Sequence, residues 1–232
     1  MLFRSAIIDE NGDPINRNAF IAFIAKILLD KYPGTTIVTD SVTSTGLADY
    51  IKAYGGKHRR FKRGYRNVIN EAIRLNKAGE ECHLAMETSG HGAIKENYFL
   101  DDGAYLATMA LIELTRLKKE GKPLSRFLED LKQPSESEEL RYRINADNFR
   151  KRGEAILKAF EKFAAEQPGW SLELPNEEGV RVNCGAKAGN GWCLMRLSLH
   201  EPKMPINIES EEMGGCAKIA DQIGRASCRE RV

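Results

Sequence analysis

CHLAMETSGHG, residues 82–92, is the clearest indication of the fold. Its first five residues are mostly apolar and typical of a buried strand, and a polar, glycine-containing loop follows at once. TTIVT at 35–39 is β-branched and predicts another strand, and 59–63 predicts a short third one. Apolar spacing predicts helices at 19–31, 47–54 and 68–79 and a long helix around 106–114. Strands that alternate with helices imply a parallel sheet, which binds ligands at the carboxyl ends of its strands.

A second pattern begins after residue 131. KQPSESE at 132–138 is polar, contains proline and predicts a linker between domains. An amphipathic helix is predicted over 146–165, followed by strands at 170–174, 180–183, 192–198 and 205–208 and a closing helix at 215–222. The predicted fold class is therefore α/β: a three-layer α/β/α domain with a mixed, largely parallel sheet, followed by a smaller α+β domain with an antiparallel sheet.

The composition is that of an ordinary globular chain. Hydrophobic residues make up 42% of the 232 residues and charged residues 29%, and the net charge of +2 favours neither a polyanion nor a membrane surface as partner. The apolar run 19–29 contains Lys26 and is too short to span a bilayer, and no secretory signal pattern precedes it. Five cysteines, an odd number, indicate reduced thiols and a cytoplasmic location.

The two ends of the chain differ from its middle. LFRS at 2–5 and IGR at 223–225 can be encoded by the two strands of one short DNA sequence, CTCTTCCGATCT and its reverse complement, which resembles sequencing-adaptor DNA. We therefore expect residues 1–5 and 223–232 to be adaptor-derived scars rather than a natural start and a natural basic tail. The natural chain would then run from about Ala6 to Gln222.

ETSGHG at 87–92 is the first candidate site. Glu87, Ser89 and His91 bring a carboxylate, a hydroxyl and an imidazole within five residues, which is a dense set of partners for neighbouring sugar hydroxyls. The two glycines allow the backbone to approach a ligand closely. The spacing fits equally a polar loop in which His91 merely caps the next helix.

RLSLHEP at 196–202 is the second candidate. Arg196 offers a planar fork to phosphate oxygens, and the Ser198 hydroxyl lies two residues on, on the same strand face. Taken alone the motif is weak, because an arginine on an exposed strand is usually just solvated.

HRRFKRGYR at 58–66 is the third candidate, since basic and aromatic side chains together can bind nucleic acid. The chain as a whole is not basic, so a phosphate-facing loop at 63–65 or a solvated strand is favoured. GAKAGNG at 185–191 lacks the end of a P-loop and predicts a hairpin turn. Cys184 and Cys193 flank that turn without a second pair of metal ligands.

Together these loops resemble a known family. TDSVTS at 39–44, FKRGYRNV at 61–68, ETSGH at 87–91 and KENYFLDDGAY at 95–105 are similar to the third domain of the α-D-phosphohexomutases, the phosphomannomutase/phosphoglucomutase family. The resemblance extends over about 6–222 and corresponds to the C-terminal half of the family. It implies a remnant of the second domain at 6–33, a third, sugar-binding domain at 34–133 and a fourth, phosphate-binding α+β domain at 134–222.

The resemblance also implies roles for individual residues. The implied substrate contacts are Gly64, Tyr65, Glu87, Ser89 and His91 for the sugar, and Arg196, Ser198 and His200 for the phosphate that does not react. Leu199 and His200 stand where the family has Gly or Asn and then Thr, so His200 would replace that hydroxyl as donor.

The activity implied is that of an isomerase of carbohydrate metabolism. Such a phosphotransferase interconverts hexose 1-phosphates and hexose 6-phosphates through a phosphoserine, a hexose 1,6-bisphosphate and magnesium. In members of the family, the serine and the magnesium loop lie N-terminal to the part that this chain resembles. Arg4 stands where the arginine of that loop would be. We therefore expect a phosphosugar partner, neither nucleic acid nor membrane, no catalytic or metal-binding residue in this chain, and no activity of the chain alone. The alternative is a non-catalytic phosphosugar-binding or regulatory module.

Overall fold

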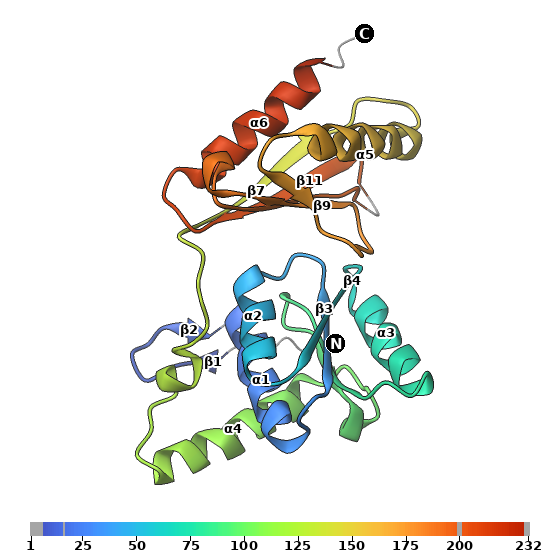
Figure 1. Ribbon diagram of the computed structural model, residues 1–232. Coiled ribbons are helices and arrows are strands. Elements are labelled where there is room, and N and C mark those ends of the chain that lie inside the picture. Colours follow the sequence, from blue (N-terminus) through green and yellow to red (C-terminus); the bar gives the residue numbers. More distant parts are fainter. Residues whose placement is uncertain (1–6, 16, 199–200, 230–232) are drawn as a thin grey trace. The chain divides into compact units, whose positions relative to one another are not determined.

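The structure, a computed structural model, describes residues 7–15, 17–198 and 201–229. The chain divides into two compact units, residues 1–133 and 134–232. Each unit has a sheet and a hydrophobic core of its own, and Figure 1 labels their helices and strands.

A four-stranded sheet organises the first unit, in the order β4-β3-β5-β6. β3 (Thr36–Asp40), β4 (Lys57–Phe61) and β5 (Cys82–Met86) are parallel, and β6 (Gly92–Ile94) pairs antiparallel with β5. The predicted mixed, largely parallel sheet is confirmed, with β4 starting two residues earlier than expected. Every side chain of β3 and β5 is buried, because helices cover both faces.

These helices form the outer layers of the unit (Figure 1). Along one face of the sheet lie α1 (Arg17–Lys31), α2 (Thr45–Ala53) and α4 (Gly103–Lys119), and along the other lies α3 (Tyr65–Lys77). Strand alternation explains the division, since Ile37 joins the core of the first three helices whereas its neighbour Val38 joins the core of α3.

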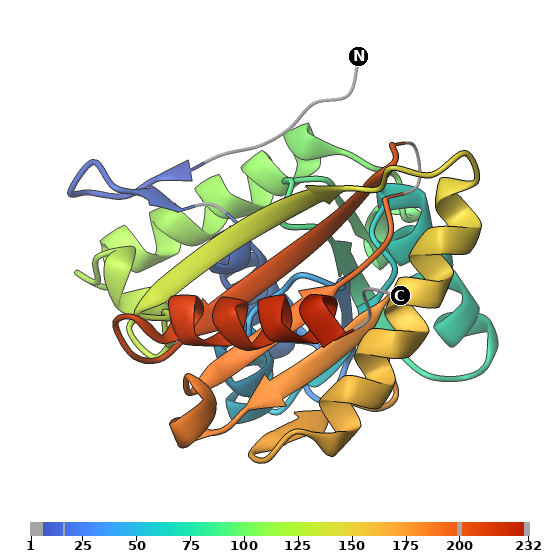
Figure 2. The ribbon, with the colours of Figure 1, turned by 90° about the horizontal axis from the view of Figure 1, so that it is seen from above.

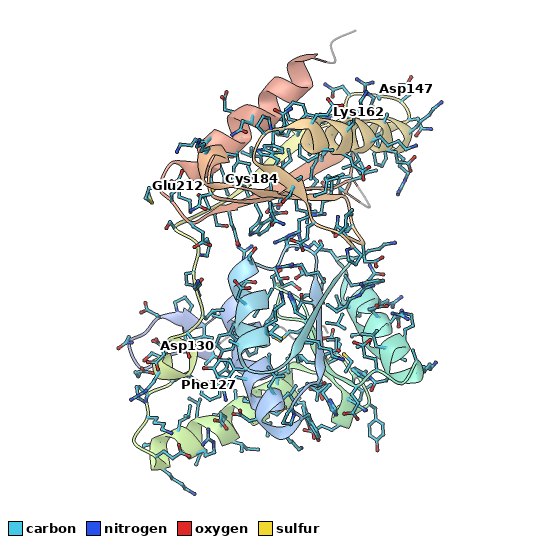
Figure 3. All side chains as sticks on the ribbon, viewed as in Figure 1. Phe127, Asp130, Asp147, Lys162, Cys184 and Glu212 are labelled. Carbon is cyan, nitrogen blue, oxygen red and sulfur yellow. The ribbon has the colours of Figure 1, made fainter. Side chains whose placement is uncertain are left out.

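Shorter elements complete the first unit. They are the hairpin of β1 (Ile7–Ile8) and β2 (Pro14–Ile15) and the 3₁₀ turns η1 (Lys95–Asn97) and η2 (Ser125–Leu128). The segment around η2 returns to the helices, where Phe127 and Asp130 are labelled in Figure 3. Phe127 packs edge-on against Phe23 with ring centroids 5.2 Å apart, and Asp130 accepts a 2.7 Å hydrogen bond from the Tyr54 hydroxyl.

Helix α1 is part of the core of the first unit. Phe20, Ile24 and Leu28 are completely or almost completely buried in the same cluster as Ile37 of β3. The domain boundary predicted between residues 33 and 34 therefore falls inside one structural unit. A helix that buries this much apolar surface against the sheet cannot be separated from it without exposing that surface to water.

A five-stranded antiparallel sheet organises the second unit, in the order β7-β11-β10-β9-β8. Its strands are β7 (Glu136–Arg143), β8 (Trp170–Leu172), β9 (Val180–Cys184), β10 (Gly191–Met195) and β11 (Lys203–Ser210). Helices α5 (Phe149–Glu166) and α6 (Gly215–Arg229) lie over one face of it (Figure 2). The predicted smaller α+β unit is confirmed, and the 3₁₀ turn η3 (Ala186–Ala188) lies in the predicted hairpin turn between β9 and β10.

Two predictions in this unit are wrong. Residues 136–138, expected in a linker, begin β7, which pairs with β11 along its whole length. Because β7 is a largely exposed edge strand, charged residues take the place of the apolar alternation that marks a strand in a sequence. The closing helix continues to Arg229 rather than ending at Gln222, and Ile223 is buried in the core. That residues 223–232 are adaptor-derived stays a prediction.

The four cysteines whose side chains the structure describes are free thiols. Cys82, Cys184, Cys193 and Cys216 are all buried. Burial raises the pKa of Cys82 to about 12, and the adjoining Cys184 thiol together with burial raises the pKa of Cys193, so thiolates are scarce at neutral pH. Within the described part of the chain, no helix has both the length and the apolar character needed to cross a membrane.

Candidate functional site

Three loops leave the carboxyl ends of β3, β4 and β5 at one edge of the first sheet. The loop after β4 turns at Gly64, whose φ of +111° is rarely adopted by residues with a side chain. A Cβ at Gly64 would also lie only 3.0 Å from Asn67 Nδ2. Glycine at this position therefore lets Tyr65 begin α3 directly at the edge of the sheet.

Glu87 joins the loop after β5 to the loop after β4. Its side chain is almost completely buried, and Oε1 accepts a 2.7 Å hydrogen bond from the Gly64 amide. Its other oxygen, Oε2, accepts from the Ser89 hydroxyl at 3.3 Å. The backbone holds the carboxylate in place, because Glu87 N donates to His91 O at 2.9 Å. Two carboxylate oxygens offer about four acceptor positions, so Glu87 retains the capacity to accept from a ligand hydroxyl.

His91 is oriented by two neighbours. Its Nδ1 lies 2.8 Å from Asp101 Oδ2, and Tyr65 stacks on the ring with centroids 5.2 Å apart. A carboxylate can only accept, so Nδ1 carries the proton and Nε2 is the ring atom that remains for a ligand. The alternative in which His91 caps a helix is wrong, because Asp102 caps α4 by accepting from the amides of Ala104 and Tyr105.

The five residues expected at the sugar, Gly64, Tyr65, Glu87, Ser89 and His91, are thus connected to one another. Glu87 bonds to two of them through its side chain, and ring stacking links Tyr65 to His91. The connected set combines a carboxylate, a hydroxyl, an imidazole and an aromatic ring that come from two loops. Such a mixture of acceptors and donors suits a ligand with several neighbouring hydroxyls.

Asp40, at the end of β3, was not among the predicted site residues. Its side chain is completely buried. Oδ2 accepts from the Thr88 hydroxyl at 2.8 Å and lies 3.5 Å from Arg63 Nε, and Oδ1 accepts from the Thr88 amide at 3.3 Å. Burial raises the pKa of Asp40 to about 6 against the opposing charge of Arg63, and the negative charge of Glu87 adds to the rise. In the sequence, Asp40 lies directly after a predicted buried strand and within the TDSVTS motif at 39–44.

The basic segment 58–66 is largely engaged within its own unit. Arg59 pairs with the buried Glu71 at 3.2 Å, and Arg60 donates to the Ser44 carbonyl at 2.9 Å. Because β4 ends at Phe61 and α3 begins at Tyr65, residues 62–64 form a loop rather than a strand. These contacts stabilise the first unit and place the loop after β4 beside Glu87. They also occupy side chains that a basic surface for binding a polyanion would need to leave exposed.

The expected phosphate residues lie in the second unit, at the end of the β10–β11 hairpin. Arg196 N donates to Pro205 O at 3.1 Å and Ser198 N donates to Lys203 O at 3.0 Å, so backbone pairing continues past the ends of the strands. The Ser198 hydroxyl accepts from Glu201 N at 3.3 Å, which makes it part of the turn. His200 lies outside the described residues.

Glycine at position 179 supports this hairpin. Its φ is +62°, and a Cβ there would collide with the Met195 carbonyl oxygen and lie 2.9 Å from Arg196 Cα. The chain before β9 can therefore lie against the backbone of Arg196 only because residue 179 has no side chain.

The described residues do not form a metal site of their own. Among them, no three His, Cys, Asp or Glu side chains converge as metal ligands would. Asp101 and Asp102, the adjacent acidic pair, are instead bonded to His91 and to the start of α4.

The fold and the loop cluster define an α/β domain with a polar edge at the carboxyl ends of parallel strands. The family model described as phosphoglucomutase/phosphomannomutase, alpha/beta/alpha domain III, matches residues 16–134, about half of the chain. The chain therefore belongs to the phosphoglucomutase/phosphomannomutase family, and the resemblance noted in its loops is confirmed. Helix α1 lies within this match.

Individual relatives extend the similarity to the second unit. The chain is 26% identical to a phosphoglucomutase from Neisseria gonorrhoeae over 94% of its own length and 44% of that protein. A phosphoglucomutase/phosphomannomutase family protein from Burkholderia thailandensis shares the fold, with a TM-score of 0.74, 24% identity and coverage of 99% of this chain and 45% of that one. An N-acetylphosphoglucosamine mutase from Aspergillus fumigatus, solved with GlcNAc-6P and magnesium, has a TM-score of 0.55 at 12% identity, over 96% of this chain and 46% of that one. The chain thus spans less than half the length of these proteins.

Proposed function

We propose that this chain supplies the sugar-binding and phosphate-binding loops of a phosphohexomutase, an isomerase that interconverts hexose 1-phosphate and hexose 6-phosphate. The observation that carries the proposal is the connected set around Glu87. Glu87, Ser89 and His91 would bind sugar hydroxyls, and Gly64 and Tyr65 would form the second wall of the sugar site. In the second unit, Arg196 and Ser198, with His200, would bind the phosphate that does not react.

These residues would act by positioning rather than by bond making. Phosphoryl transfer depends on in-line alignment and on neutralising charge, and small misplacements of the reacting groups are costly. The Glu87 carboxylate, fixed by the Gly64 amide, would orient the hydroxyl-bearing face of the ring. Arg196 would hold the remote phosphate through charge-assisted hydrogen bonds, which serve either end of a bisphosphate equally well.

Catalytic groups and magnesium ligands are proposed to lie in a further part of a longer protein. No cluster of metal-binding side chains occurs in the described residues, so no step here is assigned to magnesium. Support comes from the relatives, one of which was solved with magnesium, and from the 44% of the gonococcal phosphoglucomutase that this chain spans. We therefore propose that the chain alone binds hexose phosphate without converting it.

Calorimetric titration of the chain with glucose 1-phosphate tests the proposal, with a coupled assay for glucose 6-phosphate run in parallel. We expect weak, millimolar binding and no turnover. Glu87→Gln and Arg196→Met should each weaken binding on the order of tenfold, by the loss of one strong hydrogen bond or charge contact. Glu81→Gln is the matched control, because this carboxylate is exposed at the opposite end of β5.

The same titration separates the alternatives. A non-catalytic binding or regulatory module would bind the phosphosugar tightly on its own, in the micromolar range or below. Binding of glucose as strong as that of glucose 1-phosphate would remove the phosphate site from the proposal. Turnover by the pure chain would show that catalytic groups had been misplaced.

A further inference from the structure

A closed ring of contacts links the three loops at the edge of the first sheet. Asp40 contacts Arg63, Arg63 is bonded covalently to Gly64, the Gly64 amide donates to Glu87, Glu87 is bonded covalently to Thr88, and Thr88 donates back to Asp40. These five residues, the Asp40 ring, come from the ends of β3, β4 and β5. A closed ring constrains the separation of the loops more strongly than any single contact, because no loop can move without breaking two links.

Burial determines what Asp40 can do in this ring. Its side chain has no exposed surface, so it can touch neither a sugar nor a phosphate. A buried carboxylate is costly to desolvate, and an ion pair to a partly exposed arginine returns only part of that cost. The pKa of Asp40, raised by burial, reflects the same cost. Because the Asp40 carboxylate contributes little to the stability of the fold, its contacts indicate a role in positioning the loops.

We propose that Asp40 is a positioning residue that sets the spacing between the Gly64–Tyr65 loop and the Glu87–His91 loop, and thereby the width of the hexose site. It acts on one side through Arg63 and on the other through the amide and the hydroxyl of Thr88. The charged groups that face it are Arg63, from the loop after β4, and Glu87, from the end of β5. That the ligand is a hexose rests on the proposed function. That Asp40 sets the spacing of the loops does not.

Amide hydrogen exchange at Gly64 tests the spacing, because the Gly64 amide donates to Glu87 and is thus the link between the two loops. In Asp40→Asn, Arg63 loses the negative charge of the Asp40 carboxylate, while an acceptor remains for the Thr88 amide. We expect exchange at Gly64 to accelerate on the order of tenfold or more. Arg63→Met should do the same, and the double variant should add little to either, because both act on one link.

A ligand readout and a control complete the experiment. Titration with glucose 1-phosphate, well below the melting temperature, should show affinity reduced on the order of fivefold in both single variants. Thr36→Val removes a 2.6 Å hydrogen bond to Glu80 at the other end of β3, and should lower stability without accelerating exchange at Gly64 or changing affinity.

The outcomes separate the two proposals. Folded Asp40→Asn and Arg63→Met variants with wild-type exchange at Gly64 would overturn the positioning role. Accelerated exchange in a chain whose wild type binds no glucose 1-phosphate would uphold it and refute the proposed function. If Asp40→Asn does not fold, Arg63→Met carries the same test, since Arg63 is one-third exposed and its loss leaves the strand intact.

Discussion

The sugar loops proposed in the first unit and the phosphate loop proposed in the second are held in place by different kinds of contact. In the first unit, side chains from three strand ends bind one another, and the Glu87 carboxylate accepts from a backbone amide of another loop. In the second unit, Arg196 and Ser198 are placed by backbone pairing at the end of a hairpin. The sugar loops should therefore respond to the chemistry of single side chains, and the phosphate loop to changes in the backbone.

The largest expected effect comes from the glycine that supports the phosphate hairpin. Gly179→Ala should lower the free energy of unfolding of the second unit by about 4 kcal/mol, the sum of a strained positive φ and an overpacked contact. The collision is with the Met195 carbonyl, a backbone atom that cannot rotate away. Urea denaturation followed by tryptophan fluorescence measures the change, because Trp170 and Trp192 both lie in this unit.

Two further glycines sharpen this comparison. Gly64→Ala should cost less, about 2 kcal/mol, because the obstacle there is the side chain of Asn67, which can move. Gly214→Ala is the control for strain alone, since its φ is +79° with no atom within 4 Å of a new Cβ. If Gly179→Ala lowers the free energy of unfolding no more than Gly214→Ala does, the close contact between residue 179 and Arg196 does not exist in the folded chain.

A smaller effect is expected from pH, through Asp40 in the first unit. Asp40 has a pKa of about 6 in the folded chain and an ordinary value near 3.8 when unfolded, so the folded state binds the proton more tightly. Its contribution to stability is therefore greatest at low pH and falls as pH rises to about 6. Between pH 7 and pH 5 the wild type should gain about 1.4 kcal/mol relative to Asp40→Asn.

Comparing the two chains at each pH cancels the other carboxylates. Glu71 and Glu96, for example, have lowered pKa values because of hydrogen bonds from Arg74 and Lys31, and they weaken the fold as pH falls. Urea midpoints for both chains at pH 5, 6 and 7 provide the difference. The stability of the wild type relative to Asp40→Asn should rise as pH falls from 7 to 5. A difference that stays constant, or that falls over this range, would contradict the raised pKa.

The smallest effects concern the helix caps. Ser44 caps α2 from a buried position and accepts from Leu47 N at 3.0 Å, whereas Asn148 caps α5 at the surface and accepts from Lys151 N at 3.0 Å. Ser44→Ala should lower the free energy of unfolding by about 1 kcal/mol and Asn148→Ala by about 0.5 kcal/mol. Water can bond to the amide that loses its cap at the surface, but not to the buried one. Thermal melts of the two variants rank them, and the reverse order would show that burial does not decide the cost.

The predictability of the fold differed between the units for a physical reason. Strands such as 35–39 and 82–86 were identified within a residue because burial on both faces demands continuous apolar or β-branched residues. β7 was missed because an edge strand can be almost wholly polar. The boundary that the resemblance implies at 33/34 lies inside the first compact unit, because helix α1 packs its apolar residues into the core of that unit.

Periodicity and motifs were enough to predict the class of each unit, the family and the residues that form the polar loops. Periodicity and short motifs are local properties, and a local pattern is enough to show them. The bond from Gly64 to Glu87, the contact of His91 with Asp101 and the ring closed by Asp40 become visible only in the folded chain. Their partners are separated by 23, 10 and 23 residues along the chain. Gly64 meets Glu87, and Asp40 meets Arg63, because parallel strands end at the same edge of the sheet, whereas an antiparallel bridge to Ala93 places Asp101 beside His91.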